Sequence, residues 1–174
     1  EGVDGHLALG SVAHTLLHGG AAAVALAPEG YREVAPESIQ RVVVGFQDTP
    51  ESEYAVRIAA DVAVPQGIPV QLLTVVVRMT RILGARIGRD PERAVMQALV
   101  EHERAAQARF TEDSGLPITG EVVQGDTAGR AMSRFDWQDS DVFVAESSSL
   151  GVLSRVFLGD LTHKLLRACT APAV

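Results

Sequence analysis

The sequence has few of the residues that mark secreted, membrane-spanning or nucleic-acid-binding proteins. Cys169 is the single cysteine among 174 residues, which excludes an intrachain disulfide framework and favours a reducing compartment. There is no signal peptide and no run of 18 apolar residues, so we expect a soluble, cytoplasmic protein. The 15 basic residues are outnumbered by 22 acidic ones, giving a formal net charge of −7. This balance argues against non-specific binding to nucleic acid or to anionic membranes.

Short catalytic motifs are also missing. The sequence contains no G-x-S-x-G elbow, no Walker loop and no C-x-x-C pair. His14 and His18 stand four residues apart, a spacing that can hold a metal on one helix face. No third ligand is nearby, whereas a structural zinc site needs four. Glu146 and Asp160 offer an alternative as a cation site or acid–base pair. We therefore predict that the protein binds no metal, has no catalytic residue and is not an enzyme.

Strand-like and helix-like patterns alternate from residue 41 onward. Runs rich in β-branched residues predict buried strands at 41–46, 70–77, 118–123 and 141–145. Helical spacing of apolar residues predicts helices at 51–64, 90–110, 127–137 and from 161 onward. The first follows the cap Thr49-Pro50 and has the apolar stripe Tyr54, Ala55, Ile58, Ala59, Val62 and Ala63. This alternation predicts a parallel sheet with helices on both faces. Between two elements, residues 78–89 carry four arginines and are expected to form a mobile flap, the alternative being an interaction site.

An internal repeat connects the two ends of the sequence. Residues 9–24 align without gaps on residues 158–173, at a constant offset of 149 residues (158 − 9 = 149). This offset is about one domain length. We therefore expect residues 1–32 to be the C-terminal helix and strand of a preceding unit, followed by a linker at 33–40 and a nearly complete second unit at 41–174. Residues 22–26 should lie beside residues 171–174 of the same or another chain.

Two segments of the second unit resemble the universal stress protein family, in the tandem arrangement known among bacteria. VVVGFQDTPES, from Val42, resembles the family turn V-G-V-D-G-S-P-x-S. LSRVFLG and THKLLR, from Leu153 and Thr162, are similar to the approach to its last helix and to that helix. The resemblance implies an open, five-stranded, mainly parallel, Rossmann-like sheet of order 3-2-1-4-5. It also implies a homodimer or pseudo-dimer formed through the last strands.

The same resemblance implies a nucleotide pocket at the carboxyl ends of the first and fourth strands, where Gln47 and Glu146 meet. The family motif Gly-two-Gly-nine-Gly-Ser/Thr falls here on Glu, Ser, Gly and Asp, so one glycine of three is kept. Gln47 stands where ATP-binding members carry an acidic residue facing the nucleoside. The positions of the pocket in this sequence are Gln47, Val76, Glu146, Ser149, Gly159, Asp160 and Thr162.

The substitutions in this motif oppose phosphate binding. Glycine lets the backbone approach a phosphate closely, whereas Glu146 and Ser149 bring side chains into that space. Asp160 can cap its own helix and use N–H groups that an anion would need. We therefore predict a degenerate pocket without a cofactor, in a non-enzymatic stress-response domain that acts mainly through dimerisation or an unidentified protein partner. The alternative is an ATP- or AMP-binding protein that acts as a nucleotide-dependent switch or slow ATPase.

Overall fold

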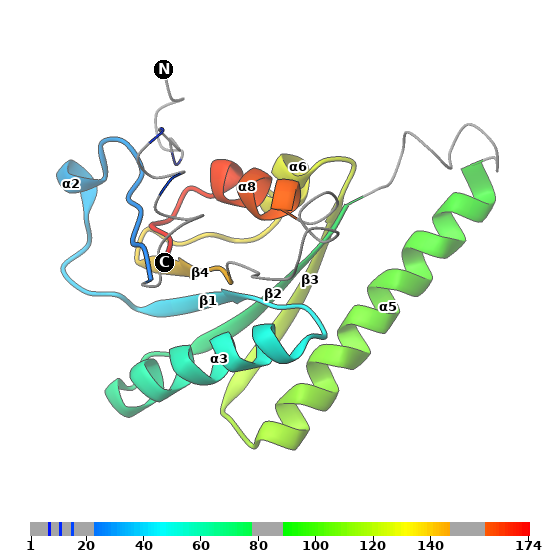
Figure 1. The fold of residues 1–174 in the computed structure, drawn as a ribbon, viewed down its shortest axis with the longest axis horizontal. Helices are drawn as coiled ribbons and strands as arrows, with labels where there is room; N and C mark the ends of the chain where they lie inside the picture. Colours follow the sequence, from blue (N-terminus) through cyan, green and yellow to red (C-terminus); the bar gives the residue numbers. More distant parts are fainter. Residues whose placement is uncertain (1–6, 8–10, 12–14, 16–22, 78–88, 147–158) are drawn as a thin grey trace.

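A four-stranded parallel sheet forms the centre of the protein. The computed structural model describes residues 7, 11, 15, 23–77, 89–146 and 159–174. The strands lie in the order β3-β2-β1-β4 (Figure 1). They are β1 (Arg41–Gly45), β2 (Val70–Val77), β3 (Ile118–Gly125) and β4 (Asp141–Val144), and each pairs in parallel with its neighbour. The α/β architecture with a parallel sheet is therefore confirmed.

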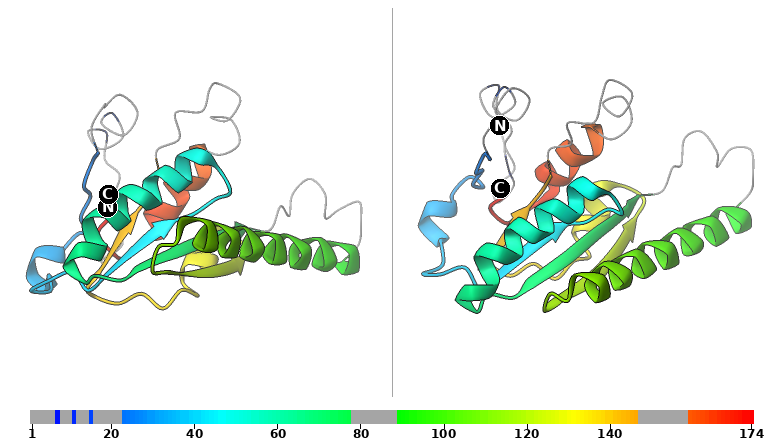
Figure 2. Two further views of the ribbon diagram at one scale, coloured as in Figure 1. Left: turned by 90° about the horizontal axis from the view of Figure 1, so that it is seen from below. Right: turned by 60° about the horizontal axis from the view of Figure 1, so that its bottom comes forward.

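Helices cover both faces of this sheet, as the views in Figure 2 show. One face carries α3 (Pro50–Ala63) and α5 (Arg89–Ser114), and the other carries α6 (Ala128–Met132) and α8 (Gly159–Ala168). The turn η1 (Val64–Gln66) continues α3, and α2 (Tyr31–Val34) precedes the sheet. Two helical layers bury both faces of the central strands, which explains why β1 and β2 are mostly apolar.

Alternating residues of the strands enter two separate cores. Val44 and Leu72 pack with α3 and α5, where the rings of Phe46 and Phe110 lie 5.3 Å apart. Val43 and Leu73 point to the other face, among residues of α6 and α8. Because successive side chains of a strand face opposite sides, each strand supplies both cores.

The predicted fifth strand is not formed as a strand among the described residues. Ala173 makes an isolated parallel bridge to Phe143 and an isolated antiparallel bridge to Leu26. The Phe143 N–H donates to the Pro172 carbonyl at 2.8 Å, but Pro172 has no N–H with which to extend the ladder. The prediction of five strands in the order 3-2-1-4-5 was therefore wrong, since the sheet has four strands and ends at β4.

Residues 22–26 were predicted to lie beside residues 171–174, and the structure shows this contact at one residue pair, Leu26 and Ala173. The Leu26 N–H donates to the Ala173 carbonyl at 2.7 Å, and the Ala173 N–H donates to the Leu26 carbonyl at 2.8 Å. Residues 16–22, which belong to the same predicted helix and strand, lie outside the described part of the chain. Leu26 is thus joined to the end of the chain by two backbone hydrogen bonds.

Several predicted boundaries differ from the observed ones. The helix predicted at 127–137 ends at Met132, because residues 133–137 form tight turns in which Trp137 Nε1 donates to the Met132 carbonyl at 3.0 Å. The predicted linker at 33–40 begins inside α2, and the helix predicted at 90–110 extends to Ser114. Of the predicted flap at 78–89, residues 78–88 lie outside the described residues and Arg89 begins α5.

Substitution of Gly125 tests how closely β3 approaches α6. A Cβ atom at Gly125 would lie 2.6 Å from the backbone nitrogen of Ala131 and 3.0 Å from its Cα. The Ala131 N–H donates to the Thr127 carbonyl, so moving this atom weakens the first turn of α6. We expect Gly125→Ala to lower the free energy of unfolding by about 2 kcal/mol, measured by urea denaturation.

Gly45→Ala is the matched control for this substitution. It also places a Cβ within a strand, but its nearest neighbour would be Phe143 Cζ at 3.4 Å, an ordinary contact. We expect a change below about 0.5 kcal/mol for this variant. Equal losses of stability in the two variants would contradict the close approach of β3 to α6.

Candidate functional site

The turn between β1 and α3 is fixed by side-chain hydrogen bonds. Thr49 caps α3, its Oγ1 accepting from the Ser52 N–H at 3.2 Å. The buried Ser52 hydroxyl donates to the Gly45 carbonyl at 3.3 Å and accepts from the Gln47 N–H at 3.0 Å. These bonds set the backbone of Gln47 at the carboxyl end of β1 and leave its side chain exposed.

A buried polar relay ties the carboxyl ends of β1 and β2 to α5. The Thr74 hydroxyl donates to the Phe46 carbonyl at 2.9 Å, and Gln107 Nε2 donates to Thr74 Oγ1 at 2.8 Å. Gln107 Nε2 also donates to the Glu121 carbonyl at 3.1 Å. Thr74 and Gln107 were not identified from the sequence, although a threonine within the apolar run of β2 was a signal. Both side chains are buried and serve to hold the strand ends in place.

Two carboxylates from different elements lie near each other at this edge of the sheet. Glu146 follows β4 and Glu51 lies in the first turn of α3, and both are half-buried. Burial raises the pKa of Glu146 above its usual value, and the charge of Glu51 raises that pKa further. This edge therefore favours a proton or a cation over an anion. Glu51 was not identified from the sequence, although it directly follows the turn after β1.

The predicted pocket residues lie partly at the carboxyl end of the sheet, and some of them fall outside the described residues. Val44 pairs with Val144 in the β1–β4 register, so Gln47 and Glu146 follow their strands at the same edge of the sheet. Val76 is buried within β2. Ser149 lies outside the described residues, as do His14 and His18.

The first turn of α8 contains the remaining motif positions. This helix begins at Gly159, so Asp160 lies inside its first turn and does not occupy the predicted N-cap position. Thr162 follows in the same helix. The side chains of these residues lie outside the described part of the structure.

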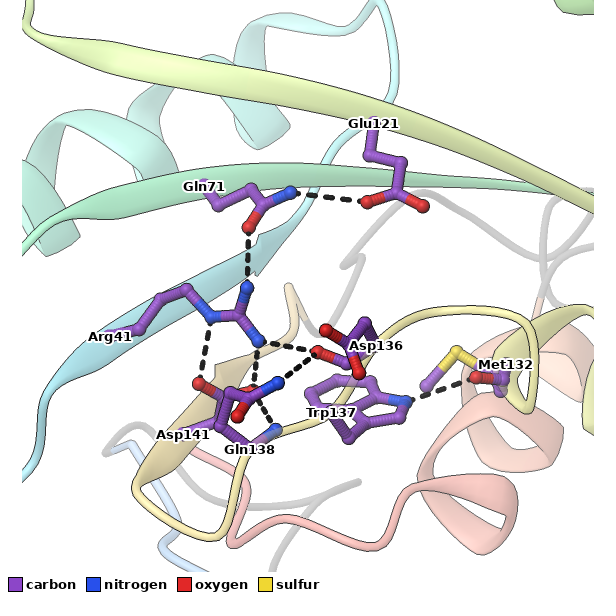
Figure 3. A network of polar contacts seen from close by, with 8 residues as sticks. All are labelled: Arg41, Gln71, Glu121, Met132, Asp136, Trp137, Gln138 and Asp141. Atoms are coloured by element: carbon purple, nitrogen blue, oxygen red, sulfur yellow. Dashed lines mark hydrogen bonds and ion pairs between the residues drawn. The ribbon is translucent and has the colours of Figure 1, made fainter.

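At the opposite edge of the sheet, a polar network joins all four strands (Figure 3). Asp141 is fully buried and receives two bonds from Arg41, Nε to Oδ1 at 2.8 Å and Nη2 to Oδ2 at 2.6 Å. Arg41 Nη1 donates to Gln71 Oε1 at 2.9 Å, and Gln71 Nε2 donates to Glu121 Oε2 at 3.3 Å. The hydrogen bond from Arg41 to Asp141 raises the pKa of the guanidinium. Because its members satisfy one another, we interpret this network as a structural tie between the strands.

Metal and thiol chemistry find little support in the described residues. Within them, no group of three or more His, Cys, Asp or Glu side chains could hold a metal ion. Cys169 is buried, and burial raises the pKa of its thiol to about 12, so it is a packing residue. The helices of the described ranges include none whose length and apolar character would allow it to cross a membrane.

Comparisons with known proteins agree on one family. The sequence profile described as "Universal stress protein family" matches residues 38–174. Universal stress proteins of Mycobacterium tuberculosis and Mycobacterium bovis are each 30% identical over 174 residues, covering 95% of this chain and 57% of the relative. The chain therefore spans little more than half the length of these relatives. The structure of the universal stress protein UspA of Lactobacillus plantarum shares the fold, with a TM-score of 0.54, 14% identity, and coverage of 80% of this chain and 98% of that chain.

Proposed function

Because the chain belongs to the universal stress protein family, we propose that the unit at 41–174 is a non-enzymatic stress-response module that acts through association with other protein units and does not use ATP. The observation that carries this proposal is the half-buried Glu146 beside Glu51, at the edge where β1 and β4 end. Ligands of open α/β sheets bind outside the carboxyl ends of the strands, at the point where the strand order reverses. In this protein, two acidic side chains occupy that position.

The charge of these two side chains opposes a bound triphosphate. Two like charges about 4–6 Å apart repel by roughly 3–4 kcal/mol at an effective dielectric constant of 20. A micromolar affinity corresponds to about 8 kcal/mol of binding free energy. Repulsion from Glu51 and Glu146 is therefore large enough to remove much of the affinity that an ATP-binding relative could reach.

We also propose that residues 1–32 end a preceding unit and that the protein associates through its terminal strands. The repeat at an offset of 149 residues and the antiparallel Leu26–Ala173 bridge support this arrangement. The greater length of the curated relatives is consistent with it. A second chain could supply the same contact in a homodimer. The single cysteine fits our further proposal of a cytoplasmic location.

Calorimetry on the unmodified protein tests the proposed function. Titration with Mg-ATP and with AMP should give no saturable heat up to millimolar concentration. Sedimentation velocity should show association that ATP does not change, because the contact lies in the terminal strands. Titration with Mg²⁺ alone controls for binding of the metal to Glu51 and Glu146. Micromolar ATP binding, or ATP hydrolysis, would overturn the proposal in favour of a nucleotide-dependent switch or slow ATPase.

A further inference from the structure

An apolar groove runs along α3 on the sheet face that α3 shares with α5. Val42, Val142 and Val144 line it from β1 and β4, while Ala23, Val24 and Val174 line it from the terminal segments. Figure 2 shows β4 beside α3 in the view from this face. The groove has a volume of about 880 Å³. Pockets for small molecules usually measure about 300–1,000 Å³ and are mostly apolar.

Helix α3 presents two apolar stripes, and the second one borders the groove. Its first stripe, with Val56 and Ala60, is buried in the core. In the second stripe, Tyr54, Ile58 and Val62 are 66%, 49% and 62% exposed. Seven large apolar side chains are exposed among the described residues, and five of them line this groove: Ile39, Tyr54, Ile58, Val62 and Val174. Single exposed apolar residues are ordinary, but a patch gathered around one groove indicates a binding surface.

The charge of the groove indicates which ligand fits it. Among the described residues, its lining contains two charged side chains, Glu51 and Glu146, and no Lys, Arg or His. Both glutamates belong to the carboxyl edge of the sheet, so the charge is gathered at one end. The pKa of Glu146 is raised by burial and by the charge of Glu51, in agreement with a carboxylate that has no cationic partner among the described residues of the lining. A ligand with a cationic group at one end would supply that partner.

We propose that this groove binds an amphipathic organic cation, whose apolar body lies along α3 and whose ammonium group lies between Glu51 and Glu146. Each methylene group buried in the groove should tighten binding about fourfold, and the two carboxylates should select the charge of the head group. The proposal goes beyond the stress-response role proposed above, because it concerns a different ligand on the α3 face of the sheet.

Calorimetry with three probes of equal chain length tests the proposal. Octylammonium, octanol and octanoate share their apolar body and differ in the charge of the head group. We expect saturable binding of octylammonium at least tenfold tighter than that of octanol, and no binding of octanoate. Methylammonium has the head group without the body and should give no saturable heat over the same concentration range.

Substitutions in the first turn of α3 provide a matched pair. Glu51→Gln should weaken octylammonium binding about tenfold and leave octanol binding unchanged, because only the charged head group contacts the carboxylate. Glu53→Gln removes the same charge from the same turn, but Glu53 does not line the groove, so the affinity should not change. Ile58→Lys, at a half-exposed position, should abolish octylammonium binding in a protein that still melts cooperatively. The readout is the affinity for octylammonium in the absence of nucleotide, so this result can fail while the proposed function stands.

The pH dependence gives a further readout. Octylammonium stays charged at acidic pH, whereas Glu146 becomes neutral as the pH falls through its raised pKa. Binding should therefore weaken at a pH above the range in which an ordinary glutamate titrates. Equal affinity for the three probes, or unchanged octylammonium binding in Glu51→Gln, would overturn the proposal. Absence of octylammonium binding, together with self-association that Ile58→Lys abolishes, would also overturn it and assign the groove to a second copy of this chain.

Discussion

The triple variant Glu146→Gly, Ser149→Gly and Asp160→Ser is expected to bind ATP at micromolar concentration, at least about a hundredfold more tightly than the unmodified protein. The variant restores the glycines of the family motif and the hydroxyl that follows them. It removes two negative charges and clears side chains from the path of the phosphates. It also removes a negative charge from the first turn of α8, where the helix dipole favours an anion. Isothermal titration calorimetry with Mg-ATP measures the gain.

A charge-matched variant separates the effect of the motif residues on ATP affinity from the effect of a lower net negative charge. Glu112→Gln with Asp113→Asn removes two negative charges from exposed positions near the end of α5, far along the chain from the motif. This variant should not bind ATP. Adding Gln47→Asp to the triple variant should strengthen binding further, because a carboxylate accepts hydrogen bonds from ribose hydroxyls. A triple variant that folds normally and still ignores ATP would show that the motif residues do not account for the missing affinity.

The substitution Asp141→Asn is expected to lower the free energy of unfolding by about 3 kcal/mol. Asp141 is fully buried, and its carboxylate accepts two bonds from Arg41 and one from the Gln138 N–H at 2.8 Å. An amide at this position cannot accept from all three donors, and it leaves the guanidinium without its counter-ion. The Arg41 side chain is 21% exposed, so water reduces the penalty below that of a wholly buried cation.

Urea denaturation of three variants checks this expectation. Asp139→Asn makes the same chemical change at an exposed position two residues away and should alter stability by less than about 0.5 kcal/mol. The double variant Arg41→Met with Asp141→Leu should lose less stability than Asp141→Asn, because it leaves no unpaired charge. If Asp141→Asn were as stable as Asp139→Asn, the network at the amino ends of the strands would not be the tie that its geometry indicates.

The order of strands and helices could be predicted from the sequence because it depends on local patterns. β2 was predicted at the observed residues, 70–77, because a short continuous run rich in β-branched residues favours a strand that is buried on both faces. The start of α3 was predicted because Thr49 and Pro50 form a local cap whose hydrogen bond reaches three residues ahead. These sequence patterns lie within one helical turn or one strand, so they predict the element without knowledge of contacts between distant residues.

Helix α3 illustrates what periodicity leaves open. The sequence predicted a helix with the stripe Tyr54, Ala55, Ile58, Ala59, Val62 and Ala63. The structure buries Ala63 of this stripe, together with Val56 and Ala60, and exposes Tyr54, Ile58 and Val62. Both faces of the helix are apolar, so its periodicity could not indicate which face meets the sheet. In the folded chain, Val56 and Ala60 pack in the core that α3 shares with α5, and the exposed residues of α3 line the groove.

Contacts between residues far apart in the chain required the tertiary structure. Glu51 and Glu146 lie 95 positions apart in the sequence (146 − 51 = 95), and only the parallel pairing of β1 with β4 brings them to one edge of the sheet. The loss of the fifth strand likewise depended on how residues 171–174 meet both Phe143 and Leu26. Local propensities act within a few residues of the chain, whereas burial, ion pairing and sheet closure depend on partners that only the folded chain supplies.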